Sequence, residues 1–114
     1  MELEVVDRPD GVTQLSLVGR LDVSGLHAVD ERFHAETAER QRPAIVDVSG
    51  LEYIASLGMG MLISCAASLK RRGHPMVLVG ASGDVATALR RAGIDQAIPM
   101  AADVDDALRL LGRS

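Results

Sequence analysis

The residues best suited to chemistry in this chain stand together at one junction. An apolar run from Ala44 to Val48 is followed by Ser56-Leu57-Gly58-Met59-Gly60, where a helix is expected to begin. The start of a helix offers unpaired backbone N–H donors and a partial positive charge, and both attract an anion. A serine hydroxyl at that place can carry a phosphate or meet the carboxylate of a partner protein. The junction therefore predicts a switch or a docking surface more than a reaction centre.

Ser56 allows two interpretations, and the sequence leaves both open. As an N-cap, its hydroxyl would accept a hydrogen bond from the N–H of Gly58 or Met59, which is worth about 1 kcal/mol. As a phosphate acceptor, it would gain a charge of about −1.5 to −2. Gly58 and Gly60 lack the third glycine of a dinucleotide fingerprint and the lysine of a P-loop. We interpret these two glycines as places where backbones approach closely, which would also let a partner approach the helix start.

Two further groups of residues could carry chemistry. His27, Glu31 and His34 recur at steps of four and three, so they share a helix face on which a metal site is geometrically feasible. A solvated polar face explains them more simply, because no nearby segment supplies another ligand. Cys65 falls on a helical stripe with Leu57, Met61 and Leu69 and is expected to be a core residue. Because no Ser-His-Asp or Cys-His grouping is evident, we expect no metal, no cofactor and no enzymatic activity.

The junction lies within an alternating series of strands and helices. Period-two alternation around Leu3, and again from Leu15 to Leu21, predicts an antiparallel hairpin near a sheet edge. Helical spacing then predicts helices at 24–40 and 57–72, a third from a cap at Ser82 to Gly93, and a last one from a cap at Asp103. Apolar strands are expected between them, at 44–48, 76–79 and 97–99. The order ββαβαβαβα predicts an α/β fold, with a mixed sheet, parallel central strands and about four helices, in a single domain over residues 1–114.

Composition excludes several classes of protein. The 114 residues carry a net charge of −4, and aromatic residues make up only 2% of the chain, as Phe33 and Tyr53. With so few aromatic side chains for stacking and an acidic balance, we expect no nucleic-acid binding. No apolar run is long enough to cross a bilayer, and Met1-Glu2-Leu3-Glu4 does not begin a secretory signal. The single cysteine forms no internal disulfide, so we expect a soluble cytoplasmic protein without direct membrane insertion.

Three segments of the chain, in register with this order of elements, resemble the STAS domain, the fold of bacterial anti-sigma factor antagonists. Val18 to Asp22 is similar to the end of the family's second strand, where a glycine is followed by a leucine and an aspartate. Ile45 to Leu51 is similar to its central strand, and Tyr53 to Leu62 is similar to its signature loop and helix start. The resemblance covers nearly the whole chain.

The resemblance implies a function in transcription regulation. In this family the antagonist binds an anti-sigma factor, which in many systems is also a serine-protein kinase, and thereby frees a sigma factor. The kinase phosphorylates a serine or threonine at the signature helix start, the complex dissociates, and a phosphatase resets it. The implied partner surface is the signature loop, the start of the second helix and the turn Asp22-Val23-Ser24-Gly25. Its expected contact residues are Asp22, Ser24, Ser56, Leu57, Gly58 and Met59. Asp22 can equally be interpreted as a helix cap or an Asx-turn.

The chain departs from the family's signature at the position that matters most. The usual signature reads aspartate-serine-serine-glycine, and its second serine is the one phosphorylated. Here the corresponding residues are Ala55-Ser56-Leu57-Gly58, so Leu57 occupies the acceptor's position and Ala55 replaces the acid. Either Ser56, which matches the first serine, has become the acceptor, or this protein is not switched by phosphorylation.

Two functions of different kinds are consistent with these residues. The first is a regulatory module like the anti-sigma factor antagonists, which binds an anti-sigma factor with kinase activity. The second is the cytoplasmic STAS subunit of a phospholipid-trafficking ABC transporter, which would dock on a permease or ATPase without phosphate cycling. The leucine at position 57 suits the second. An exposed edge strand would also allow two copies to pair as a homodimer.

Overall fold

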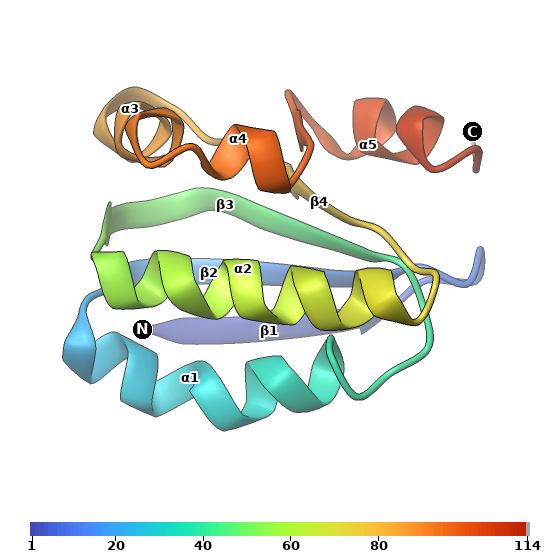
Figure 1. Ribbon diagram of the computed structural model, residues 1–114, viewed down its shortest axis with the longest axis horizontal. Coiled ribbons are helices and arrows are strands. Elements are labelled where there is room, and N and C mark those ends of the chain that lie inside the picture. Colours follow the sequence, from blue (N-terminus) through green and yellow to red (C-terminus); the bar gives the residue numbers. More distant parts are fainter. Residues whose placement is uncertain (114) are drawn as a thin grey trace.

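The computed structural model describes residues 1–113, and its centre is a five-stranded sheet (Figure 1). The strands lie side by side in chain order, with β1 pairing antiparallel to β2 and every later pair parallel. Their bounds are β1 Glu2–Asp7, β2 Thr13–Leu21, β3 Ala44–Ile54, β4 Met76–Val79 and β5 Met100–Ala101. The predicted hairpin and the predicted parallel centre of a mixed sheet are therefore confirmed.

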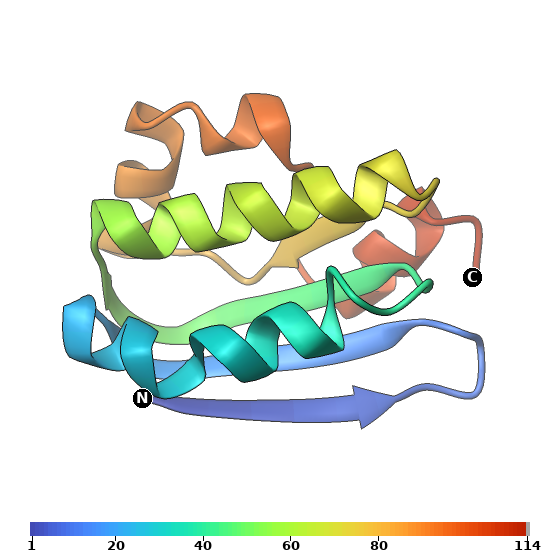
Figure 2. The same ribbon diagram turned by 60° about the horizontal axis from the view of Figure 1, so that its bottom comes forward.

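Helices α1 to α4 pack on one face of the sheet, and α5 alone packs on the other. Their bounds are α1 Val23–Glu36, α2 Ser56–Arg71, α3 Gly83–Arg91, α4 Ile94–Ala97 and α5 Val104–Leu110. Figure 2 shows α1 and α2 lying against the near side of the sheet, with α5 behind it. Crossover connections between parallel strands require such helices, because the chain must return to the same end of the sheet before each new strand.

Two apolar clusters hold these layers together. The larger lies between the sheet and helices α1 to α4, and Leu15, Phe33 and Leu62 are fully buried within it. The smaller lies under α5, where Ala107 and Leu108 pack with Ile45, Val77 and Val79. Because β3 is covered on both faces, its first half reads as an almost continuous apolar run, as a central strand requires.

The predicted order of elements is confirmed, but several of its boundaries were wrong. The strand predicted to end at Val48 continues to Ile54 as β3. The first helix ends at Glu36 and not at Arg40, because the hydroxyl of Thr37 donates to the Phe33 carbonyl (2.6 Å) and the Thr37 backbone leaves the helical region. Residues 97–99 do not form a strand. The N–H of Ile98 closes a helical turn on the Ile94 carbonyl (2.8 Å), and pairing with β4 begins only at the Pro99 carbonyl.

Some of the expectations about single residues are confirmed and others are not. Asp103 caps α5, since its carboxylate accepts from the N–H of Asp106 (2.8 Å). Ser82 is the N-cap residue of α3, but its side chain makes no capping hydrogen bond. Leu57, which the sequence allowed either on the apolar stripe of α2 or as an exposed partner contact, is 58% exposed, whereas Cys65 is fully buried as predicted. None of the helices among residues 1–113 combines the length and the hydropathy needed to span a bilayer.

Candidate functional site

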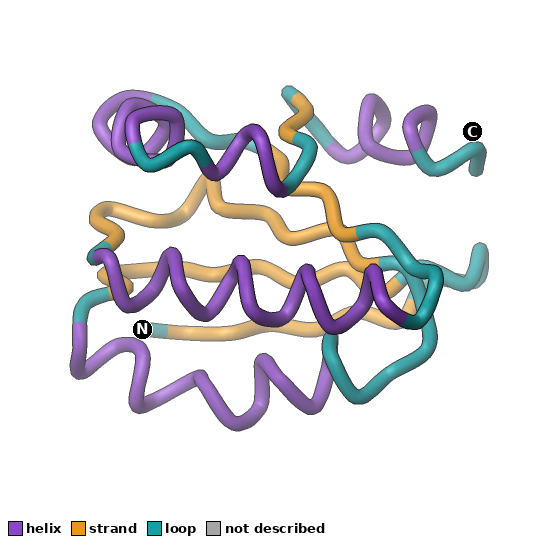
Figure 3. The backbone as a smooth tube through the Cα atoms, viewed as in Figure 1, coloured by secondary structure: helices purple, strands orange, loops and turns teal. Residues whose placement is uncertain are grey.

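The candidate site forms where two neighbouring parallel strands end. Because β2 and β3 run in the same direction, the helices that follow them begin at one edge of the sheet, as the left side of Figures 1 and 3 shows. A backbone hydrogen bond joins the two junctions, with the N–H of Ala55 donating to the Leu21 carbonyl (2.9 Å). The start of α2 is thereby fixed beside the start of α1.

Ser56 is the first residue of α2 and not its N-cap. The N-cap is Ala55, which has extended backbone angles (φ −89°, ψ 165°) and no side-chain hydrogen bond to the helix. The predicted capping role of Ser56 is therefore wrong, since the helix begins one residue earlier than expected. The first amide to bond within the turn is that of Met59, which donates to the Ala55 carbonyl (3.1 Å). The preceding N–H groups stand at the positive end of the helix, beside the serine hydroxyl.

The first turn of α2 presents one side to solvent and packs with the other. Ser56 and Leu57 are exposed, Met59 is half-buried against the core, and Gly58 is buried. A hydroxyl and an apolar side chain are thus adjacent on the exposed side. This combination can bind an apolar surface of another protein, and a phosphate on the hydroxyl would disturb that contact.

Gly58 allows α2 to approach β2. A methyl group placed on Gly58 would lie 2.7 Å from Cγ of the buried Leu21, which is closer than real Cβ atoms approach another heavy atom. It would also lie 3.2 Å from the Leu21 carbonyl oxygen. The interpretation of close approach is confirmed at this glycine. It is wrong for Gly60, where an added methyl group would meet nothing within 4 Å.

Asp22 holds the start of α1 and belongs to a small polar cluster. Its carboxylate accepts from the N–H of Gly25 (2.8 Å), so the capping interpretation is confirmed, and Ser24 is an exposed residue of the first turn. The other carboxylate oxygen lies 3.7 Å from Nε of Arg20, whose guanidinium stacks over the ring of Tyr53 at 4.6 Å. These contacts connect the ends of β2 and β3 across the surface.

One exposed residue at this edge, Arg20, was not predicted from the sequence, whereas Val23 and Tyr53 lie in the turn and the signature loop of the implied partner surface. Val23 is 51% and Tyr53 is 42% exposed, and Arg20 lies against the Tyr53 ring. Tyrosine and arginine are the residue types most often found to dominate binding at protein interfaces. The topology alone could have indicated Arg20, since the ends of two neighbouring parallel strands must meet at one edge of the sheet. We call the surface made by Asp22, Val23, Tyr53, Ser56 and Leu57 the docking edge.

Shallow grooves flank the docking edge on both sides. One, of about 410 Å³, lies over the start of α1 and is lined by residues that include Arg20, Asp22 and Ser24. The other, of about 290 Å³, lies between the end of β3 and α3 and is lined by residues that include Tyr53, Glu52 and Asp84. A partner that covers the edge would find hollows for its side chains beside the exposed aromatic ring.

One arrangement resembles catalytic machinery, but its thiol is enclosed. Sγ of Cys65 lies 3.5 Å from Nδ1 of His34, and Nε2 of His34 lies 3.4 Å from a carboxylate oxygen of Asp30. The sequence did not suggest this pair, because it is formed between α1 and α2. Burial raises the pKa of the Cys65 thiol to about 11, so the nucleophilic thiolate is scarce near neutral pH. Within residues 1–113, no three His, Cys, Asp or Glu side chains are grouped closely enough to hold a metal ion.

Comparison with known proteins identifies the family. The sequence matches the STAS domain over residues 5–107, so the chain belongs to the STAS domain family. No curated protein sequence matches it significantly.

Solved structures of similar fold include anti-sigma factor antagonists. One from Mycobacterium paratuberculosis is 22% identical with a TM-score of 0.83, covering 97% of this chain and 95% of that one. An anti-sigma factor antagonist STAS domain protein from Planctomyces limnophilus is 18% identical with a TM-score of 0.84, covering 96% and 97%. The Bacillus cell fate determinant SpoIIAA in its phosphorylated form is 14% identical with a TM-score of 0.70, covering 96% and 99%. At these identities the likeness establishes the fold.

Proposed function

We propose that this protein is a bacterial regulatory module of the anti-sigma factor antagonist kind, a single cytoplasmic domain that binds an anti-sigma factor with serine kinase activity and catalyses no reaction itself. The observation that carries the proposal is the exposure of Ser56 and Leu57 at the first two positions of α2, within the docking edge. Membership of the STAS family and the antagonists among its structural neighbours support this choice of partner.

Phosphorylation of Ser56 would act as the switch. The phosphate would add a charge of about −1.5 to −2 next to Leu57, which is 58% exposed and available for an apolar contact. The phosphate would keep its hydration shell, so a partner could no longer close over the leucine without a desolvation cost. Arg20 offsets the charge of Asp22 at this edge (Nε to Oδ2, 3.7 Å), so the added phosphate would supply most of the negative charge that an acidic partner surface meets. A phosphatase would reverse the modification.

The test is a calorimetric titration of this protein with an anti-sigma factor that has serine kinase activity and comes from the same genome. We expect Ser56→Ala to bind like the unchanged protein and Ser56→Glu to bind about tenfold more weakly, a difference of about 1.4 kcal/mol. Ser64→Glu is the matched control, because Ser64 is an exposed serine further along the same helix. Equal affinities for Ser56→Ala and Ser56→Glu would rule out the switch. If the anti-sigma factor bound neither the unchanged protein nor any of the serine variants, the proposed partner would be ruled out.

A second function is favoured by one observation, the exposed Leu57 in place of the family's usual acceptor. The protein would then be the cytoplasmic STAS subunit of a phospholipid-trafficking ABC transporter, docking on its permease or ATPase through the same edge without phosphate cycling. In that case Ser56→Glu and Ser56→Ala would bind the ATPase equally well, and Leu57→Asp would bind poorly. The two Ser56 variants therefore separate the two functions, because only the first function predicts a difference in affinity between Ser56→Ala and Ser56→Glu.

A further inference from the structure

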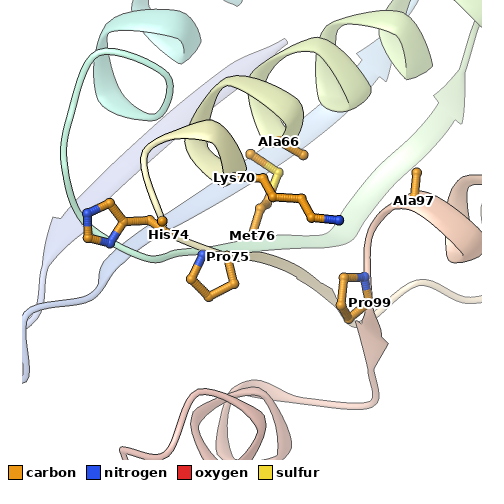
Figure 4. A pocket seen from close by; sticks show the side chains of 8 residues that line it. Ala66, Lys70, His74, Pro75, Met76, Ala97 and Pro99 are labelled. Atoms are coloured by element: carbon orange, nitrogen blue, oxygen red, sulfur yellow. The ribbon is translucent and has the colours of Figure 1, made fainter.

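A groove remote from the docking edge lies at the other end of α2 (Figure 4). It has a volume of about 390 Å³ and opens between the last turns of α2, the start of β4 and the segment joining α4 to β5. Apolar groups dominate its lining, chiefly the side chains of Ala66, Pro75, Met76, Ala97 and Pro99. Its size falls in the range of sites that hold small molecules.

The ionisable side chains that line the groove are all basic. Its only ionisable lining residues are Lys70 and His74, and no carboxylate lines it. Figure 4 shows the Lys70 side chain reaching across the groove toward Ala97, while the His74 ring points the other way. Within the described part of the chain, Lys70 has no acidic side chain within ion-pair distance, although Arg8, Arg20, Arg40 and Arg109 each have one. The ammonium group is therefore available to an anion outside the protein.

The polar groups of the lining limit the chemistry of the ligand. Alanine, proline and methionine side chains cannot donate hydrogen bonds, so the body of the ligand must be apolar. Met76 at the base is almost fully buried and has a flexible, polarisable side chain that adapts to an alkyl chain. The head of the ligand must be an anion that reaches the exposed Lys70 ammonium at the rim.

We propose that this groove binds a single-chain aliphatic carboxylate of medium length, with its alkyl chain along Ala66, Met76 and Pro99 and its carboxylate beside Lys70. The ligand would contact the last turns of α2, while Ser56 stands in the first turn of the same helix (Figure 1). The groove is independent of the partner proposed for the docking edge, so either assignment can fail without the other.

The experiment follows ligand binding to the intact protein by amide NMR shifts and calorimetry. Hexanoate, octanoate and decanoate vary the chain, and octylamine reverses the charge of the head. We expect the affinity to rise about fourfold for each added methylene group that is buried, until the groove is filled. Octanoate should bind about fivefold or more tightly than octylamine, and the shifted amides should surround Ala66 and Met76.

Variants locate the site. Lys70→Gln should weaken octanoate binding about two- to fivefold, as expected for a solvent-exposed ion pair. Arg90→Gln is the control, because Arg90 is an exposed cation outside the groove and should leave binding unchanged. Ala66→Leu should reduce binding of every chain length by filling the groove, and its thermal unfolding shows whether the fold is kept.

Three results would overturn the proposal. The first is no binding of octanoate or decanoate, including the case in which only an acidic peptide binds. The second is equal affinity for octanoate and octylamine, which would mean that Lys70 takes no part. The third is unchanged octanoate binding in both Lys70→Gln and Ala66→Leu, which would place the ligand elsewhere on the protein.

Discussion

Replacing Gly58 by alanine tests the packing that positions the docking edge. The new methyl group would lie 2.7 and 2.8 Å from Cγ and Cδ2 of Leu21 and 3.2 Å from its carbonyl oxygen. Leu21 is fully buried, so its side chain has no free space into which it can turn. Overpacking of this kind costs about 1–3 kcal/mol, and alanine regains about 0.5–1 kcal/mol because it is a better helix former than glycine.

The expected net effect is a loss of up to about 2.5 kcal/mol in the free energy of unfolding. Urea unfolding followed by circular dichroism measures it, and a slope of about 2 kcal/mol per molar urea converts the loss into a midpoint lower by up to about 1.2 M. Gly60→Ala is the matched control two residues away. Since open space surrounds Gly60, its replacement should stabilise the protein by about 0.5–1 kcal/mol. If Gly58→Ala proved as stable as Gly60→Ala, the close approach of α2 to Leu21 would be refuted.

Three further predictions concern single residues. Asp22→Ala should lower the free energy of unfolding by about 1 kcal/mol, because the Gly25 N–H at the start of α1 loses its acceptor, and Asp22→Asn should keep most of the stability. Equal urea midpoints for Asp22→Ala and the unchanged protein would contradict the capping role. Cys65 should resist iodoacetamide at pH 8 in the native protein and react fully in denaturant, because burial protects the thiol and raises its pKa to about 11. Mass spectrometry measures the labelling. Rapid labelling of the native protein would contradict this prediction and show that the α1–α2 interface opens. Incubation with the kinase and ATP should place phosphate on Ser56, which phosphosite mapping would detect; phosphate on another serine instead would remove Ser56 from the proposed switch.

The order of elements was predictable because each type of element leaves a period in the sequence. The short, β-branched apolar run from Ala44 to Val48, which follows Pro43, favoured a strand covered on both faces, and the helical stripe through Cys65 predicted that the thiol is buried. The four-residue helix Ile94–Ala97 is too short to show a helical period, so local pattern predicts a strand at Ala97-Ile98-Pro99 where the chain ends that helix. Local pattern fails where an element is shorter than about two turns.

The candidate site was predictable in position but not in detail. The sequence placed Ser56 at the helix start, yet whether it is the cap or the first helical residue depends on the hydrogen bond from Ala55 to Leu21, which joins two strands. The stacking of Arg20 on Tyr53 depends on register shifts between β2 and β3 that no local pattern reveals. Contacts of this kind are decided by tertiary structure, so they appear only once the strands are paired.

The central claim is that the exposed start of α2 contacts the partner. The most direct measurement compares two exposed leucines, Leu57 at the docking edge (58% exposed) and Leu110 on α5 (62% exposed), in titrations of the cognate anti-sigma factor. Leu57→Asp should weaken binding by about tenfold or more, and Leu110→Asp should leave it unchanged, with little loss of stability in either variant. Equal affinities for the two variants would contradict the account.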